Sequence, residues 1–184
     1  FTIPATNNYD STLNFNASLD VTGNLNIVST KKVAININTD QNISANTLNK
    51  TKDSLLSLKG IGDVRSINIA TRISAYDLDV KNLNLFVGQQ AILRGAVTMD
   101  GVSALNFTDT EGLIELVGGS SKDIYINKLT GSNVKVSDGD TEIEGYQNLK
   151  IKDVVLNDGG VLTLNGVDAT ITNSVSTGTT TKGY

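Results

Sequence analysis

The sequence lacks cysteine, histidine and tryptophan, and it contains a single proline and a single methionine in 184 residues. Without cysteine there is no disulfide and no thiolate chemistry, and without histidine the side chain that titrates near neutral pH is missing. A hydrolase built from this chain would have to use carboxylates, lysine, tyrosine or serine, and no distinctive constellation of these residues is present. The sequence therefore predicts a protein that is not an enzyme.

Clustered positive charge is also missing. The chain carries 15 lysine and arginine residues against 19 aspartate and glutamate residues, which gives a formal net charge of −4. Nucleic-acid binding needs clustered basic residues that displace counterions from phosphates, and the lysines here stand singly or in pairs such as Lys31 and Lys32. No apolar run approaches the roughly 20 residues of a membrane-spanning helix. We therefore expect no nucleic-acid partner and no membrane span.

What the sequence does contain is an alternation of apolar and polar residues in short, frequent runs. This period-two pattern is typical of half-buried β-strands. With 39% apolar and 18% charged residues the chain is too apolar for disorder, so these runs should form a core. The clearest runs span residues 13–21, 25–27, 33–37, 67–69, 83–85, 124–126, 134–136, 149–151 and 162–164.

Asp-Gly and Asn-Gly pairs separate several of these runs. Asp100-Gly101, Asp138-Gly139 and Asn165-Gly166 each lie between two alternating segments, which is the strongest short-range signal for a β-hairpin. The sequence therefore predicts an all-β fold, specifically an antiparallel β-sandwich or jelly roll with short strands and tight hairpins.

A parallel β-solenoid is the alternative, because its strands are equally short. A solenoid should repeat at a fixed period. The similar segments 24–27, 82–85 and 148–151 are unequally spaced, which favours the sandwich. Residues 45–58 carry leucines at nearly helical spacing and are predicted equally well as a helix or as strand and turn.

The ends of the chain differ from its middle. Residues 1–10 form a polar, turn-rich leader, and residues 177–184 have no apolar periodicity. We expect one all-β domain over residues 11–176 between two loose ends. The chain begins at Phe1 without an initiator methionine, as expected for a processed protein or a fragment, and both fit export.

Calcium is the one cofactor that the acidic residues suggest. Asp138, Asp140 and Glu142 are the best local cluster of carboxylates, and calcium takes several oxygen ligands from closely spaced side chains. The competing explanation is an Asp-Gly turn with acidic neighbours, since the full ligand pattern of an EF-hand is absent. No other cofactor is expected.

Four asparagines match the acceptor pattern for N-glycosylation, in which serine or threonine follows two residues later. In a chain this rich in asparagine, serine and threonine the pattern also arises by chance. The four residues are Asn16, Asn42, Asn49 and Asn106.

The chain is rich in threonine, asparagine and glycine, and its strands share a characteristic phrasing. Examples are Asn-Leu-Asn-Ile at 24–27, Ser-Ile-Asn-Ile at 66–69 and Leu-Thr-Leu-Asn-Gly at 162–166. In these features the chain resembles secreted microbial surface proteins, namely surface-layer proteins, adhesin and autotransporter passengers, and subunits of extracellular fibres. The resemblance implies an extracellular or cell-surface location and a structural or adhesive role.

We therefore expect a structural subunit that assembles with copies of itself into a surface filament or lattice. The run of Leu13, Phe15, Ala17, Leu19 and Val21 follows the loose leader and is suited to strand exchange with a neighbouring subunit. The alternative is an adhesin or carbohydrate-binding module whose partners are other surface proteins or glycans. Only 5% of the residues are aromatic, so few platforms for sugar rings are available.

Overall fold

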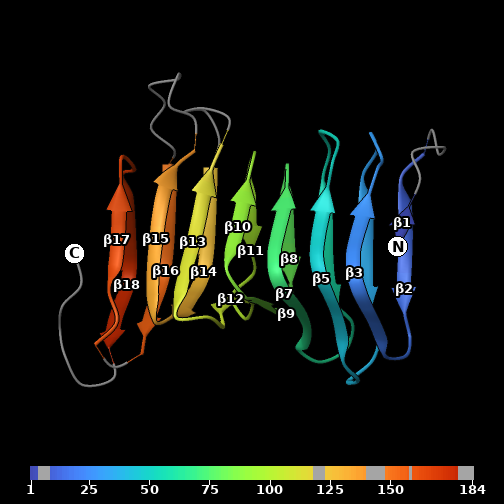
Figure 1. Ribbon diagram of the computed structural model, residues 1–184, viewed down its shortest axis with the longest axis horizontal. Coiled ribbons are helices and arrows are strands. Elements are labelled where there is room, and N and C mark those ends of the chain that lie inside the picture. Colours follow the sequence, from blue (N-terminus) through green and yellow to red (C-terminus); the bar gives the residue numbers. More distant parts are fainter. Residues whose placement is uncertain (4–8, 118–122, 140–147, 158, 178–184) are drawn as a thin grey trace.

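The structure is a computed structural model that describes residues 1–3, 9–117, 123–139, 148–157 and 159–177. The described residues form a right-to-left stack of strands in Figure 1, with the N-terminal strands at one end and the C-terminal strands at the other. Every strand pairing in this part of the chain is parallel, and each strand pairs with one from the next turn of the coil. The fold is a parallel β-solenoid of about 7 turns.

The pairings form three continuous ladders, and each turn of the chain contributes to all three. The first ladder contains β2 (Ser11–Phe15), β4 (Val33–Ile37), β6 (Leu56–Gly60), β8 (Leu78–Lys81), β11 (Val97–Met99) and the first parts of β14 (Asp123–Gly131), β16 (Asn148–Leu156) and β18 (Ala169–Thr177). The second contains the first parts of β3 (Leu19–Ile27), β5 (Ile43–Lys50) and β7 (Arg65–Ala75), then β9 (Leu83–Val87), β12 (Ala104–Phe107) and the second parts of β14, β16 and β18. The third contains β1 (Thr2–Ile3), the second parts of β3, β5 and β7, then β10 (Gln90–Leu93), β13 (Glu111–Leu116), β15 (Asn133–Asp138) and β17 (Leu162–Asn165).

The core lies inside the coil, where the apolar residues of each alternating run meet. In β4, Val33, Ile35 and Ile37 are each 0% exposed, while the residues between them face outward. The next turn repeats the pattern at the same register, with Leu56 and Leu58 also 0% exposed. The alternation that predicted strands therefore also predicted which face of each strand is buried, and both predictions are confirmed.

The prediction of an antiparallel sandwich is wrong, because the glycine turns do not reverse the chain. Asp100-Gly101 leads from β11 on the first ladder to β12 on the second, and Asn165-Gly166 leads from β17 on the third ladder to β18 on the first. Gly166 does adopt the positive φ of 71° that such a turn favours. These two dipeptides thus encode tight turns, but the turns are corners of a coil. Asp138-Gly139 makes no turn within the described residues, because Asp138 ends β15 and Gly139 continues its ladder.

The number of residues in each turn of the solenoid varies along the chain. Partner residues on successive turns are separated by as few as 18 positions, as between Asn68 and Phe86, and by as many as 28, as between Ser137 and Asn165. Fixed-period self-similarity is therefore absent although every turn has the same architecture. The helix considered for residues 45–58 is also not formed, since this segment belongs to β5 and β6 and buries Leu48, Leu56 and Leu58 inside the coil.

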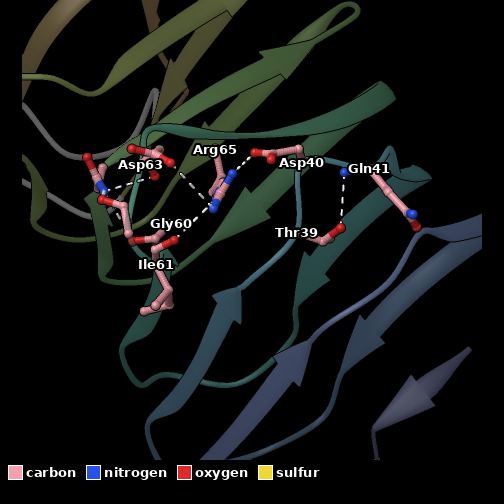
Figure 2. A network of polar contacts seen from close by, with 9 residues as sticks. Thr39, Asp40, Gln41, Gly60, Ile61, Asp63 and Arg65 are labelled. Carbon is pink, nitrogen blue, oxygen red and sulfur yellow. Dashed lines mark hydrogen bonds and ion pairs between the residues drawn. The ribbon is translucent and has the colours of Figure 1, made fainter.

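Corners of neighbouring turns are tied together by side chains. Figure 2 shows Arg65, at the start of β7, between Asp40 of the preceding turn and Asp63 of its own loop. Its guanidinium pairs with the Asp40 carboxylate, lies 3.8 Å from that of Asp63, and donates from Nε to the Ile61 carbonyl oxygen at 3.2 Å. Both carboxylates are almost fully exposed, so each ion pair contributes at most about 1 kcal/mol. This cluster positions a corner.

Candidate functional site

The outward faces of the ladders carry rows of polar side chains that bond from one turn to the next. Asn36 Nδ2 donates to Asn14 Oδ1 at 2.9 Å, and Asn49 Nδ2 donates to Asn26 Oδ1 at 3.0 Å. Ser44 Oγ donates to Asp20 Oδ1 at 2.7 Å. Parallel in-register stacking places residues of neighbouring turns at strand spacing, so these side chains find partners one turn away. The surface of the coil is therefore regular and preorganised.

The asparagines that match the glycosylation pattern belong to these rows. Asn16 and Asn42 are exposed and accept hydrogen bonds from Asn38 at 2.7 Å and Asn68 at 2.8 Å. Asn49 is half-buried, and its amide nitrogen also donates to Thr47 Oγ1 at 3.0 Å.

Asn106, the fourth acceptor candidate, is also half-buried, and its Oδ1 accepts from Thr130 Oγ1 at 2.7 Å. Glycosylation modifies the amide nitrogen, so it would compete with the hydrogen bonds that Asn49 Nδ2 donates to Asn26 and Thr47. The bonds described for Asn16, Asn42 and Asn106 use Oδ1 as the acceptor and leave the amide nitrogen out. Glycosylation stays a prediction for all four.

The calcium candidates are only partly within the described residues. Asp138 ends β15 and is half-buried, and the backbone nitrogen of Gly139 continues the ladder by donating to the Leu116 carbonyl oxygen at 2.8 Å. Asp140 and Glu142 lie outside the described residues. Within the part of the chain that the structure describes, no group of three or more acidic, histidine or cysteine side chains is placed to hold a metal ion.

The run predicted to act as one assembly strand is divided between two strands. Leu13 and Phe15 lie in β2 on the first ladder, whereas Leu19 and Val21 lie in β3 on the second, and Ala17 is in the corner between them. β2 is paired with β4, and this part of β3 is paired with β5. Among the described strands neither has a neighbour on its other side in these ladders, so both form an open end of the coil.

A long groove runs along the second ladder beside its corner with the third. Its volume is about 280 Å³, and its lining comes from successive turns between Asp20 and Thr108. Phe86 contributes apolar surface, and Ser44, Asn46 and Asn68 contribute polar groups. Ala45 and Ile69 also border the groove but are almost fully buried, at 4% and 1% exposure. Phe86 was not among the residues considered in the sequence analysis. It lies between buried Leu85 and Val87, and because side chains alternate along a strand its ring is predicted to face outward.

Lys50 is a buried ionisable residue that the sequence analysis did not consider. Lys50 is 1% exposed, and burial lowers the pKa of its ammonium despite the opposing effect of the Asp53 charge. Its Nζ donates to the carbonyl oxygens of Ser29 and, at 3.0 Å, Lys52, so it closes a loop between turns. No ion pair is formed with it among the described residues, which fits a structural role.

Asp100 tightens the corner between β11 and β12. Burial raises the pKa of its carboxyl, but hydrogen bonds from Ser103, Asn82 and Val102 outweigh that effect, and the pKa lies below its usual value. Oδ2 accepts from the Asn82 backbone nitrogen at 2.8 Å on the preceding turn. The carboxylate thus stabilises this corner of the coil.

The described residues contain no helix with the length and hydrophobicity needed to cross a bilayer. The fold places the chain in the class of parallel β-solenoid proteins. Comparison with protein-family models, with curated proteins and with solved structures finds no match.

Proposed function

We propose that the chain is an extracellular structural protein whose copies stack end to end into a filament. The observation that carries the proposal is that the core rows of the coil are uncovered at both ends of the described structure. Among the described residues the solenoid thus ends in two surfaces, each with apolar side chains and with strand edges that no described strand covers.

At the C-terminal end, exposure changes abruptly between the last two turns. Val136 and Val154 are each 0% exposed, whereas their partners on the next turn, Leu164 and Val175, are 36% and 44% exposed. These residues occupy the same inward rows. They differ because no further strand of the described chain covers the last turn.

At the N-terminal end the apolar residues of the first turn are also partly exposed. Leu13 and Phe15 are half-buried, although their partners on the next turn, Ile35 and Ile37, are 0% exposed. A hollow of about 750 Å³ opens here, and its lining includes Phe1, Phe15 and Leu19. Apolar side chains from a second copy would find space at this end, beside an edge of β2 that no described strand covers.

Strand direction determines how two copies fit. All turns run the same way, so the last turn of one copy can pair with the first turn of another in the same parallel register on all three ladders. This contact joins two different surfaces, and such heterologous contacts build open filaments when they do not close into rings. It supports edge addition, in which β2 and β3 stay in their own coil, more than the strand exchange suggested by the sequence.

A backbone substitution tests the proposal. The backbone nitrogen of Ser11 donates to the Lys32 carbonyl oxygen, and the backbone nitrogen of Asn38 donates to the Phe15 carbonyl oxygen. The backbone N–H and C=O groups of the odd-numbered residues of β2 therefore point toward β4. In a parallel ladder the nitrogen of Thr12 then points to the open edge. Thr12→Pro removes that donor without removing a bond to β4, and Thr12→Ala is the matched control.

We expect sedimentation and electron microscopy to show concentration-dependent filaments for the wild type and for Thr12→Ala, and shorter or no filaments for Thr12→Pro. Circular dichroism should show the same β content in all three. A wild-type chain that stays monomeric at the highest attainable concentration would contradict the proposal, as would filaments that Thr12→Pro leaves unchanged.

An adhesin or carbohydrate-binding module is the second candidate function. The observation that favours it is the groove along the second ladder, which runs along the side of the coil from its first turn.

A further inference from the structure

Phe86 interrupts a row of polar side chains. On the second ladder its partner on the preceding turn is Asn68, and its partner on the following turn is Asn106. Leu85 and Val87 on either side of it are buried at 1% and 0% exposure, so the alternation directs the Phe86 ring outward, where it is half-buried. An outward phenylalanine adds little to the core, because apolar burial stabilises in proportion to the area removed from water.

The ring forms part of the wall of the groove, together with residues from several turns. Asp20, Ser44, Asn68 and Phe86 are register partners on four successive turns, and Thr108 follows on the next. With strands ~4.8 Å apart, four steps give a groove roughly 19 Å long that runs along the axis of the coil. A ligand that fits it is extended and unbranched.

The polar groups along the groove have hydrogen-bonding capacity to spare. Asp20 uses Oδ1 to accept from Ser44, which leaves Oδ2. Asn68 uses Nδ2 to donate to Asn42, which leaves Oδ1, and Asn46 uses Oδ1 to accept from Thr71, which leaves Nδ2. Because the used atoms bond to neighbouring turns, the spare atoms are held at fixed positions. The groove therefore offers ordered acceptors and a donor beside an apolar ring.

This chemistry excludes two classes of ligand. No lysine or arginine lines the groove, and an aspartate does, so a polyanion would meet no countercharge. An extended peptide would need free backbone groups for strand addition, but β5, β7 and β9 are each paired on both sides. Recognition must come from side chains alone.

We propose that this groove binds a linear, neutral oligosaccharide that lies along the axis of the coil. Sugar hydroxyl groups both donate and accept, which matches the carboxylate and amide atoms left available by the stacked rows. The apolar face of a sugar ring packs on the Phe86 ring, and the other sugar units bond to the polar groups of the neighbouring turns. The proposal does not require filament formation, although Asp20, Val21 and Thr22 line both the groove and the hollow at the N-terminal end.

Titration of the full chain with neutral hexasaccharides tests the proposal. The probes are β-linked hexasaccharides of glucose, xylose and mannose, with hexagalacturonate as an anionic control. We expect calorimetry to detect at least one neutral probe at concentrations up to about 1 mM, with no binding of hexagalacturonate. The amide side-chain resonances of Asn46 and Asn68 should shift in the same titration.

The decisive variant is Phe86→Ala, and Val155→Ala is its control. Val155 lies on the same ladder, is also half-buried and outward, and does not line the groove. We expect Phe86→Ala to weaken binding at least about tenfold and Val155→Ala to change it less than about twofold, with unaltered circular dichroism for both. Absence of binding by every neutral probe overturns the proposal, as does equal weakening by both variants or stronger binding of hexagalacturonate.

Discussion

Truncation of leucine at two positions of the same inward row should have very different costs. Leu13, Ile35 and Leu58 are register partners on the first three turns of the first ladder. Leu58 is 0% exposed between two turns, whereas Leu13 lies on the terminal turn and is half-buried. Both changes delete the same atoms, so the difference measures how far the end of the coil is open.

The magnitude follows from burial. Leu58→Ala leaves a closed cavity as well as losing the transfer free energy of the side chain, and such changes cost about 3–5 kcal/mol. The space left by Leu13→Ala is open to solvent, so this change loses only part of the transfer free energy of the side chain, about 1 kcal/mol. We expect urea unfolding of dilute protein to give these two differences in the free energy of unfolding.

Protein concentration supplies a second readout. If copies stack, Leu13 becomes buried against its neighbour, and Leu13→Ala should then reduce filament formation while Leu58→Ala acts only through stability. A cost for Leu13→Ala in dilute protein equal to that for Leu58→Ala would refute the reasoning, because it would mean that the first turn is already covered in the monomer.

Two further predictions concern the interior of the coil. The pKa of Lys50 is lowered in the folded protein, so the folded state loses this proton at a lower pH than the unfolded state does. The free energy of unfolding of the wild type, relative to that of Lys50→Met, should therefore rise with pH between the lowered folded pKa and the ordinary lysine pKa. Urea unfolding at a series of pH values measures this difference. A pH-independent difference would contradict this. Gly88→Ala should destabilise by about 1–3 kcal/mol, because a Cβ at this position would lie 1.9 Å from the Ala70 carbonyl oxygen. Gly101→Ala is the control, since nothing lies within 4 Å of a Cβ there. Equal melting temperatures for the two variants would contradict the prediction, because they would show that the backbone near Gly88 moves to accommodate the Cβ.

The parts of the structure that the sequence predicted are those that depend on single strands. Alternation placed Val33, Ile35 and Ile37 correctly in the core, because the side a residue faces depends only on its parity within the strand. Pairing direction is a property of two strands and is not encoded in either of them. Asp100-Gly101 specifies a tight turn, and the same local geometry serves a hairpin or a corner.

Part of the candidate site could be predicted from the sequence for the same reason. Parity alone would have placed Phe86 on the outer surface beside Leu85 and Val87, whereas its alignment with Asp20, Ser44 and Asn68 requires the register of four turns. Those residues are separated by 24, 24 and 18 positions, so no constant offset in the sequence brings them together. A row of ligands built across turns is therefore invisible until the coil is known.

The two proposals meet at the N-terminal end of the second ladder. Asp20 lies at the open end of this ladder and also at one end of the groove, while Ser176 lies on its last described turn. Stacking in parallel register would place Ser176 of one copy next to Asp20 of the next, so the outward row would continue across the junction. An oligosaccharide bound along the side would then leave the stacking edges free, and a longer polymer could span the junction. Sugar binding should therefore not dissolve filaments, and long chains should stabilise them more than hexasaccharides do, because one polymer contacts two copies.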